Sequence, residues 1–118
     1  MTVKEIFDMR RAGRVEEAYD AILPLYRVHH GKYTTLAMFW CAVDKLNLLL
    51  TRVVGDDDNS VSALQEAERI MLSLERLYPT MHDEEQTGRQ ALSNLKIALQ
   101  HTRLRATPST GILQTNTK

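Results

Sequence analysis

The four histidines are the residues best suited to acid–base or metal chemistry in this chain. His29 and His30 are adjacent, so a helix would point them to different sides. His82 opens the run HDEE, which could bring one histidine near carboxylates. A protein metal site usually needs three or four convergent ligands, and the sequence has no H-E-x-x-H pair. We therefore interpret HDEE as the solvated start of a helix and expect no metal site.

The single cysteine, Cys41, excludes an intrachain disulfide. It lies in the apolar segment LAMFWCAVDKLNLLL, where a buried and unreactive thiol is favoured over a nucleophile. The chain has no G-x-S-x-G sequence and no glycine-rich phosphate loop. The sequence therefore predicts a protein that is not an enzyme and needs no cofactor.

A row of basic residues near the C-terminal end is the main signal for nucleic acid. Arg89, Lys96 and Arg103 are spaced by seven and would share one side of a helix. Such a row could follow phosphates, but no aromatic residue accompanies it to stack on bases. Residues 55–85 carry nine acidic and two basic side chains, so pairing within the molecule is the favoured reading. The acidic residues that we expect to meet the row are Glu66, Glu68 and Glu75.

Composition limits the class of protein. The chain has 118 residues, 43% of them hydrophobic, and a formal net charge of zero. That length suits one domain with one core, and the neutral charge gives no general attraction to nucleic acid or anionic lipid. No run approaches the roughly 20 apolar residues of a membrane span, and the N-terminus does not resemble a secretory signal. We expect a cytoplasmic protein with no membrane partner.

Hydrophobic spacing predicts an all-α fold of five helices. They should span about residues 3–12, 15–30, 35–54, 61–77 and 81–105. A single domain would cover residues 1–106, and residues 107–118 would form a flexible polar tail.

Local signals place the helix ends. Thr2 and Glu5 form a capping box, and Gly13 suits a left-handed residue after the first helix. Pro24 should kink the second helix, which we expect Gly31 to end. The later helices should be capped by Thr34 or Thr35, by Ser60 or Ser62, and by Thr80.

The third predicted helix is apolar nearly all round, which is typical of a helix buried on several sides. It should be the central helix of the fold. We expect its aromatic residues, Phe39 and Trp40, to be largely buried against the second and fourth helices.

Two segments resemble the tetratricopeptide repeat (TPR). In RRAGRVEEAYDAILPLY, Gly13, Ala18 and Ile22 match the small, small and large positions of that motif. In EAERIMLSLERLYP, Ala67, Met71 and Pro79 match its later half. The two alanines are 49 residues apart, whereas TPR units repeat near 34 residues. The chain also resembles small single-domain bacterial TPR-like proteins. The resemblance implies two stacked antiparallel hairpins and a capping fifth helix, with a plain helical bundle as the alternative.

Stacked hairpins leave a concave groove, which the first, third and fifth helices would line. Grooves of this kind hold a partner's helix or peptide, so we predict a non-catalytic adaptor or scaffold for an unidentified protein or peptide. A second copy of the chain is a further candidate partner, and a regulator that contacts nucleic acid through the fifth helix is the alternative. The predicted partner-binding residues are Phe7, Arg10, Asp44, Lys45, Asn94 and Lys96.

Overall fold

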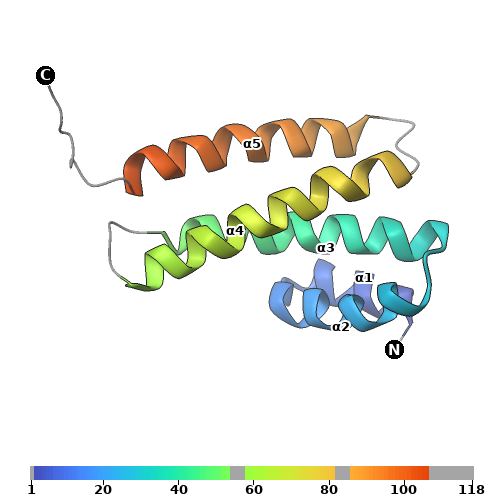
Figure 1. The fold of residues 1–118 in the computed structure, drawn as a ribbon. Coiled ribbons are helices and arrows are strands. Elements are labelled where there is room, and N and C mark those ends of the chain that lie inside the picture. Colours follow the sequence, from blue (N-terminus) through green and yellow to red (C-terminus); the bar gives the residue numbers. More distant parts are fainter. Residues whose placement is uncertain (1, 54–57, 82–85, 107–118) are drawn as a thin grey trace, which may run out of the picture.

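The computed structural model describes residues 2–53, 58–81 and 86–106 (Figure 1). Within these ranges the chain forms five α-helices and no strand, which confirms the all-α prediction. The elements are α1 (Val3–Arg11), α2 (Val15–Val28), α3 (Lys32–Thr51), α4 (Asp58–Leu77), the short 3₁₀ helix η1 (Tyr78–Thr80) and α5 (Thr87–Ala106).

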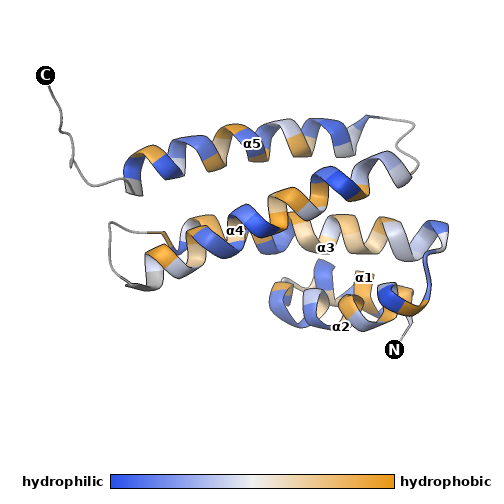
Figure 2. Ribbon diagram, in the orientation of Figure 1, coloured by the Kyte–Doolittle hydropathy of each residue, from blue (hydrophilic) through white to orange (hydrophobic). Residues whose placement is uncertain are grey.

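Helix α3 lies at the centre of the fold and packs against all four other α-helices. The hairpin of α1 and α2 packs on one part of α3, while α4 and α5 pack on another and on each other (Figure 1). In Figure 2, hydrophobic and hydrophilic residues alternate along α2, α4 and α5, as expected of helices with one buried face. Helix α5 packs on both α3 and α4, the two helices of the second hairpin.

The first hairpin forms as its local signals indicate. The Thr2 hydroxyl accepts a hydrogen bond from the Glu5 amide, and the Glu5 carboxylate accepts one from the Thr2 amide. Gly13 has φ +81°, a left-handed conformation that glycine adopts at low cost. Helix α2 continues through Pro24 without a break. It stops at Val28, however, because His29 is already extended at φ −125° and ψ 121°.

The start of α3 differs from the prediction. Gly31 is the residue before α3 rather than the end of the second helix, and α3 begins at Lys32. Thr34 and Thr35 lie inside α3 and are buried, so neither one caps it. The helix then ends at Thr51 rather than near residue 54. A glycine with extended backbone (φ −72°, ψ 169°) can occupy the N-cap position without a side-chain cap.

The predicted starts of the last two long helices are also wrong. Helix α4 begins at Asp58, so Ser60 and Ser62 lie within it, and Ser60 is buried. Thr80 does not cap a following helix, because the next one begins only at Thr87; the Thr80 hydroxyl donates a hydrogen bond back to the Leu77 carbonyl. Helix α5 begins at Thr87, after Gln86 with φ +62°. The run HDEE and the polar tail lie outside the described residues.

The core forms around α3, in which twelve of the twenty residues are buried. Phe39 is fully buried and contacts Tyr78, with ring centroids 6.0 Å apart. Trp40 packs against the same core but is only partly buried, so its predicted burial is confirmed only in part. Its ring meets Phe39 edge to face at 5.2 Å and lies 5.3 Å from the Arg10 guanidinium. Trp40 therefore faces α1 at the boundary of the core.

Candidate functional site

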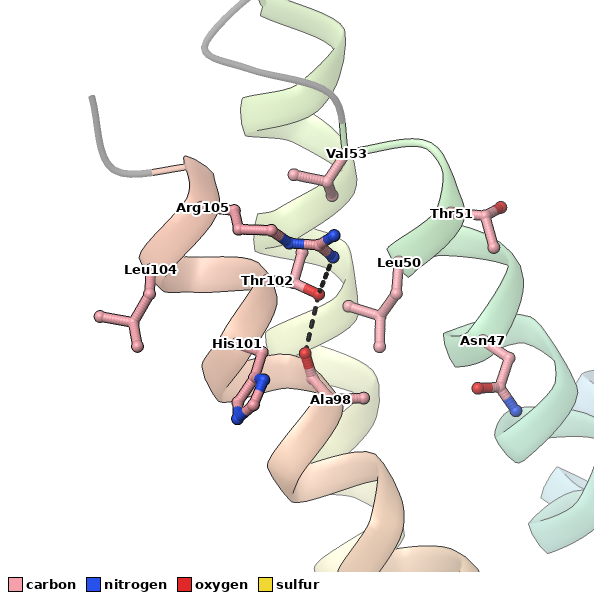
Figure 3. A pocket seen from close by; sticks show the side chains of 9 residues that line it. All are labelled: Asn47, Leu50, Thr51, Val53, Ala98, His101, Thr102, Leu104 and Arg105. Atoms are coloured by element: carbon pink, nitrogen blue, oxygen red, sulfur yellow. Dashed lines mark hydrogen bonds between the residues drawn. The ribbon is translucent and has the colours of Figure 1, made fainter. Parts of the chain in front are cut away.

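A hollow of about 780 Å³ lies between the C-terminal parts of α3 and α5 (Figure 3). Its apolar lining consists of Leu50, Val53, Ala98 and Leu104. Its polar lining consists of Asn47, Thr51, His101, Thr102 and Arg105. We call this feature the α3/α5 groove.

Packing explains why the α3/α5 groove forms. Leu50 and Thr102 belong to the buried faces of their helices, but the small side chain of Ala98 does not fill the space between them. The Thr102 hydroxyl donates a hydrogen bond of 2.7 Å to the Ala98 carbonyl, which satisfies it within α5. The walls of the groove are thus set by core residues, while its mouth is open to solvent.

The ionisable groups that line the α3/α5 groove are basic. The Arg105 guanidinium points between the two helices and lies 3.4 Å from the Thr102 hydroxyl (Figure 3). This contact uses one of its five N–H donors. His101 lies one turn earlier on α5, and the lining contains no carboxylate. The groove is therefore an apolar surface with hydrogen-bond donors at its rim.

Among the predicted binding residues, the structure brings Arg10 and Asp44 together. The Arg10 Nε lies 2.5 Å from one Asp44 carboxylate oxygen, and its Nη2 lies 3.4 Å from the other. The two side chains are 30% and 23% exposed, so the pair joins α1 to α3 at a partly covered position. Phe7 is half-buried and packs against the core.

Lys45 does not lie on the exposed side of α3, where we expected it. Its residue exposure is 8%, and its ammonium group lies 3.5 Å from the Glu16 carboxylate of α2. It also lies 5.9 Å from the centre of the Tyr19 ring. Buried lysines need such partners, because an unpaired charge away from water is costly. Lys45 therefore joins α3 to α2 and is separated from Arg10 and Asp44.

The two predicted residues on α5 face different directions. Asn94 is exposed and accepts a hydrogen bond of 3.0 Å from the Gln90 side chain. The Lys96 ammonium lies 2.9 Å from the Glu75 carboxylate of α4. Arg103, one heptad later, pairs with Glu68 of α4. The expectation that the basic row meets acidic residues of the fourth helix is confirmed for these two residues.

None of the residues that line the α3/α5 groove was predicted to bind a partner. The sequence carries only a weak signal for them: Leu50 and Thr102 fall at the helical spacing of the apolar residues in their helices. Their exposure to a hollow depends on how far α3 and α5 overlap, and hydrophobic spacing within one helix does not contain that information.

The chemistry of the remaining reactive groups is limited. Cys41 is buried, and burial raises the pKa of its thiol to about 11. The thiol is therefore protonated near neutral pH and is a poor nucleophile. Within residues 2–53, 58–81 and 86–106, no three His, Cys, Asp or Glu side chains converge on a point where a metal could bind. Over the same ranges, no helix is both long and apolar enough to span a membrane.

Comparison with known proteins returned no match: no family model, no curated protein and no solved structure is similar to this chain.

Proposed function

We propose that this protein is a non-catalytic interaction module that holds a peptide or helix of a partner protein. The observation that carries the proposal is the α3/α5 groove, with its apolar lining and hydrogen-bonding rim. Binding sites of proteins commonly combine a mostly apolar concave surface with a few polar groups that orient the ligand. The volume of about 780 Å³ falls within the usual range of roughly 300–1,000 Å³ for such sites.

The same surface extends toward α1 along one face of α3. Trp40, Asp44, Asn47 and Thr51 are spaced by four, three and four residues, which places them in a line along one side of a helix. Arg10 contacts both the Trp40 ring and the Asp44 carboxylate at the α1 end of this line. Asn47 and Thr51 line the α3/α5 groove at the other end. We infer that a partner segment lies along this face, in the manner of a TPR-like adaptor.

A helix or an extended peptide would both suit this surface. A helical partner would place apolar residues, at spacings of three and four, against Leu50 and Ala98. Backbone or side-chain acceptors of the partner would receive hydrogen bonds from Arg105 and Asn47 at the rim.

The nucleic-acid alternative receives less support. Lys96 and Arg103 form ion pairs with Glu75 and Glu68, so a phosphate backbone would have to compete with these carboxylates. Each exposed pair is worth little by itself, but its carboxylate would also repel phosphate.

The test is capture of partners from the source cells by the full chain and by two variants. Ala98→Arg fills the groove with a charged side chain, and Gln65→Arg adds the same charge to the exposed part of α4. We expect the wild type and Gln65→Arg to capture the same defined set of proteins. Ala98→Arg should fail to capture this set. Circular dichroism and melting curves check that both variants fold.

Retention of the same partners by Ala98→Arg would exclude the α3/α5 groove as the binding surface. Binding of the wild type to a random-sequence DNA duplex, with an affinity that falls steeply as salt rises, would instead support the nucleic-acid alternative.

A further inference from the structure

A second hollow, of about 320 Å³, lies between α2 and α4, and residues of α3 also line it. It shares no residue with the α3/α5 groove. Its lining consists of Tyr19, Leu23, Tyr26 and Arg27 from α2, Met38 and Ala42 from α3, and Ser73, Leu74, Arg76 and Leu77 from α4. We call this feature the α2/α4 hollow.

The α2/α4 hollow has an apolar floor and aromatic walls. Met38, Ala42 and Leu74 are buried core residues, so the floor of the hollow is apolar and closely packed. Tyr19 and Tyr26 are half-buried, and together with Leu23 they follow the i, i+4, i+7 spacing of one helix face. Two tyrosines and a leucine form a surface on which a large apolar side chain can pack.

Charge is unevenly distributed around the α2/α4 hollow: the carboxylates of Glu66 and Asp20 lie near Tyr19 at one wall, whereas the lining itself carries only cations. Arg27 and Arg76 are the ionised side chains of its lining, and both are exposed. Neither has a carboxylate within ion-pair distance among the described residues. By contrast, five other arginines are paired with carboxylates, namely Arg10, Arg11, Arg14, Arg52 and Arg103.

Helix ends explain only part of this arrangement. Arg27 and Arg76 lie in the last turns of α2 and α4, where a cation interacts favourably with the helix dipole. An arginine on any side of the last turn would interact equally well with the helix dipole. Both arginines instead line the same apolar hollow, which places two guanidinium groups beside one hydrophobic surface.

We propose that the α2/α4 hollow is a second protein-binding surface, specific for a short acidic segment of a partner protein. A large apolar side chain of that segment packs between Tyr19, Leu23 and Tyr26. Neighbouring Asp or Glu carboxylates accept charge-assisted hydrogen bonds from Arg27 and Arg76. Charge complementarity identifies this partner, because the lining supplies two cations and no anion. With both surfaces occupied, the chain would bridge two proteins.

In the experiment, a phage-displayed library of random 12-residue peptides is selected for binding to the full-length chain. The expected enriched peptides carry an aromatic or branched apolar residue beside Asp or Glu. A labelled synthetic copy of the most enriched peptide is then titrated with each variant and followed by fluorescence anisotropy. The double variant Arg27→Gln/Arg76→Gln should bind it at least about tenfold more weakly. Tyr26→Ser should weaken binding to a similar degree, with the melting temperature checking that the variant folds.

Two controls separate this surface from the α3/α5 groove. Arg11→Gln/Arg14→Gln removes the same charge from exposed positions of the first hairpin and should leave the affinity unchanged. Ala98→Arg should also leave it unchanged, whereas the same variant abolishes partner capture if the proposed function is correct. The two proposals can therefore fail independently.

Several results would overturn the inference. An acidic-segment site would be excluded if no peptide is enriched or if the enriched peptides lack acidic residues. It would also be excluded if Arg27→Gln/Arg76→Gln binds the peptide as tightly as the wild type does. Loss of peptide binding in Ala98→Arg would assign the peptide to the α3/α5 groove instead. Sedimentation of the chain with phosphatidylglycerol vesicles, lost in the double arginine variant, would identify a membrane surface rather than a protein as the partner.

Discussion

Helices α3 and α5 have the same length, 20 residues, but they play different parts in the fold. α3 packs against four helices and buries twelve residues, including the polar Thr34 and Thr35. α5 packs mainly against α3 and α4, and five of its described residues are buried. α5 also exposes two large apolar residues, Ile97 (54%) and Leu104 (70%), of which Leu104 borders the α3/α5 groove.

The two helices have equal length, so length does not decide how much of a helix is buried; α3 carries more apolar residues and packs against more neighbours. α3 is held by four neighbouring helices, so a cavity made on its buried side cannot be closed by moving one neighbour. α5 is held from one side and can shift toward a cavity. The loss caused by the same kind of substitution should therefore be larger in α3.

The largest effect is expected for Phe39→Ala in α3. Phe39 is fully buried, and its truncation should lower the free energy of unfolding by about 3–5 kcal/mol. Chemical denaturation measures this loss. Tyr33→Ala is the matched control, because Tyr33 is an aromatic residue of the same helix that is 65% exposed; it should cost less than about 0.5 kcal/mol. Similar losses for both variants would contradict the central position of α3.

Leu95→Ala in α5 should have a smaller effect, about 2–4 kcal/mol. Leu95 is 3% exposed, but α5 can move to fill part of the cavity. Hydrogen exchange should show faster opening of α5 than of α3, because a helix held by fewer neighbours opens locally more easily. Ile97→Ala is the control on the exposed side. Uniform acceleration across all five helices would mean that α5 is as central to the fold as α3.

Gly13→Ala should destabilise the first hairpin by about 1 kcal/mol. The cost comes from the backbone, because no atom lies within 4 Å of an added Cβ at φ +81°. Gly13→Asn provides a matched control at the same position, since asparagine tolerates positive φ better than alanine does. The two melting temperatures should therefore differ, with Gly13→Ala the lower. Equal values would refute the left-handed turn between α1 and α2.

The smallest effect is expected for Lys96→Gln/Arg103→Gln, which removes two ion pairs between α5 and α4. Both pairs are about half-exposed, so the combined loss should be about 1 kcal/mol or less at low salt. Salt screens exposed charges, so wild type and variant should become equally stable near 1 M NaCl. A loss that persists at high salt would show that these side chains act by packing rather than by charge.

Local chemistry within the sequence determined the number of helices, the first capping box, the left-handed Gly13 and the central place of α3. Each of these depends on residues close together in the chain, through hydrogen bonds, backbone sterics or the 3.6-residue period. Helix starts were less predictable, because several residues near each start could act as caps. In α3 the N-cap residue is Gly31, while Thr34 and Thr35 lie inside the helix and are buried in the core.

Only the tertiary structure decided which polar residues meet and where the surface is hollow. The spacing of residues in α3 could not show that Lys45 turns toward Glu16 while Asp44 turns toward Arg10, because adjacent residues of a helix face different neighbours. Nor could it show the α3/α5 groove, whose lining comes from residues about 50 positions apart in the chain. Both features depend on the rotation and offset of one helix against another, which long-range packing of the whole core determines.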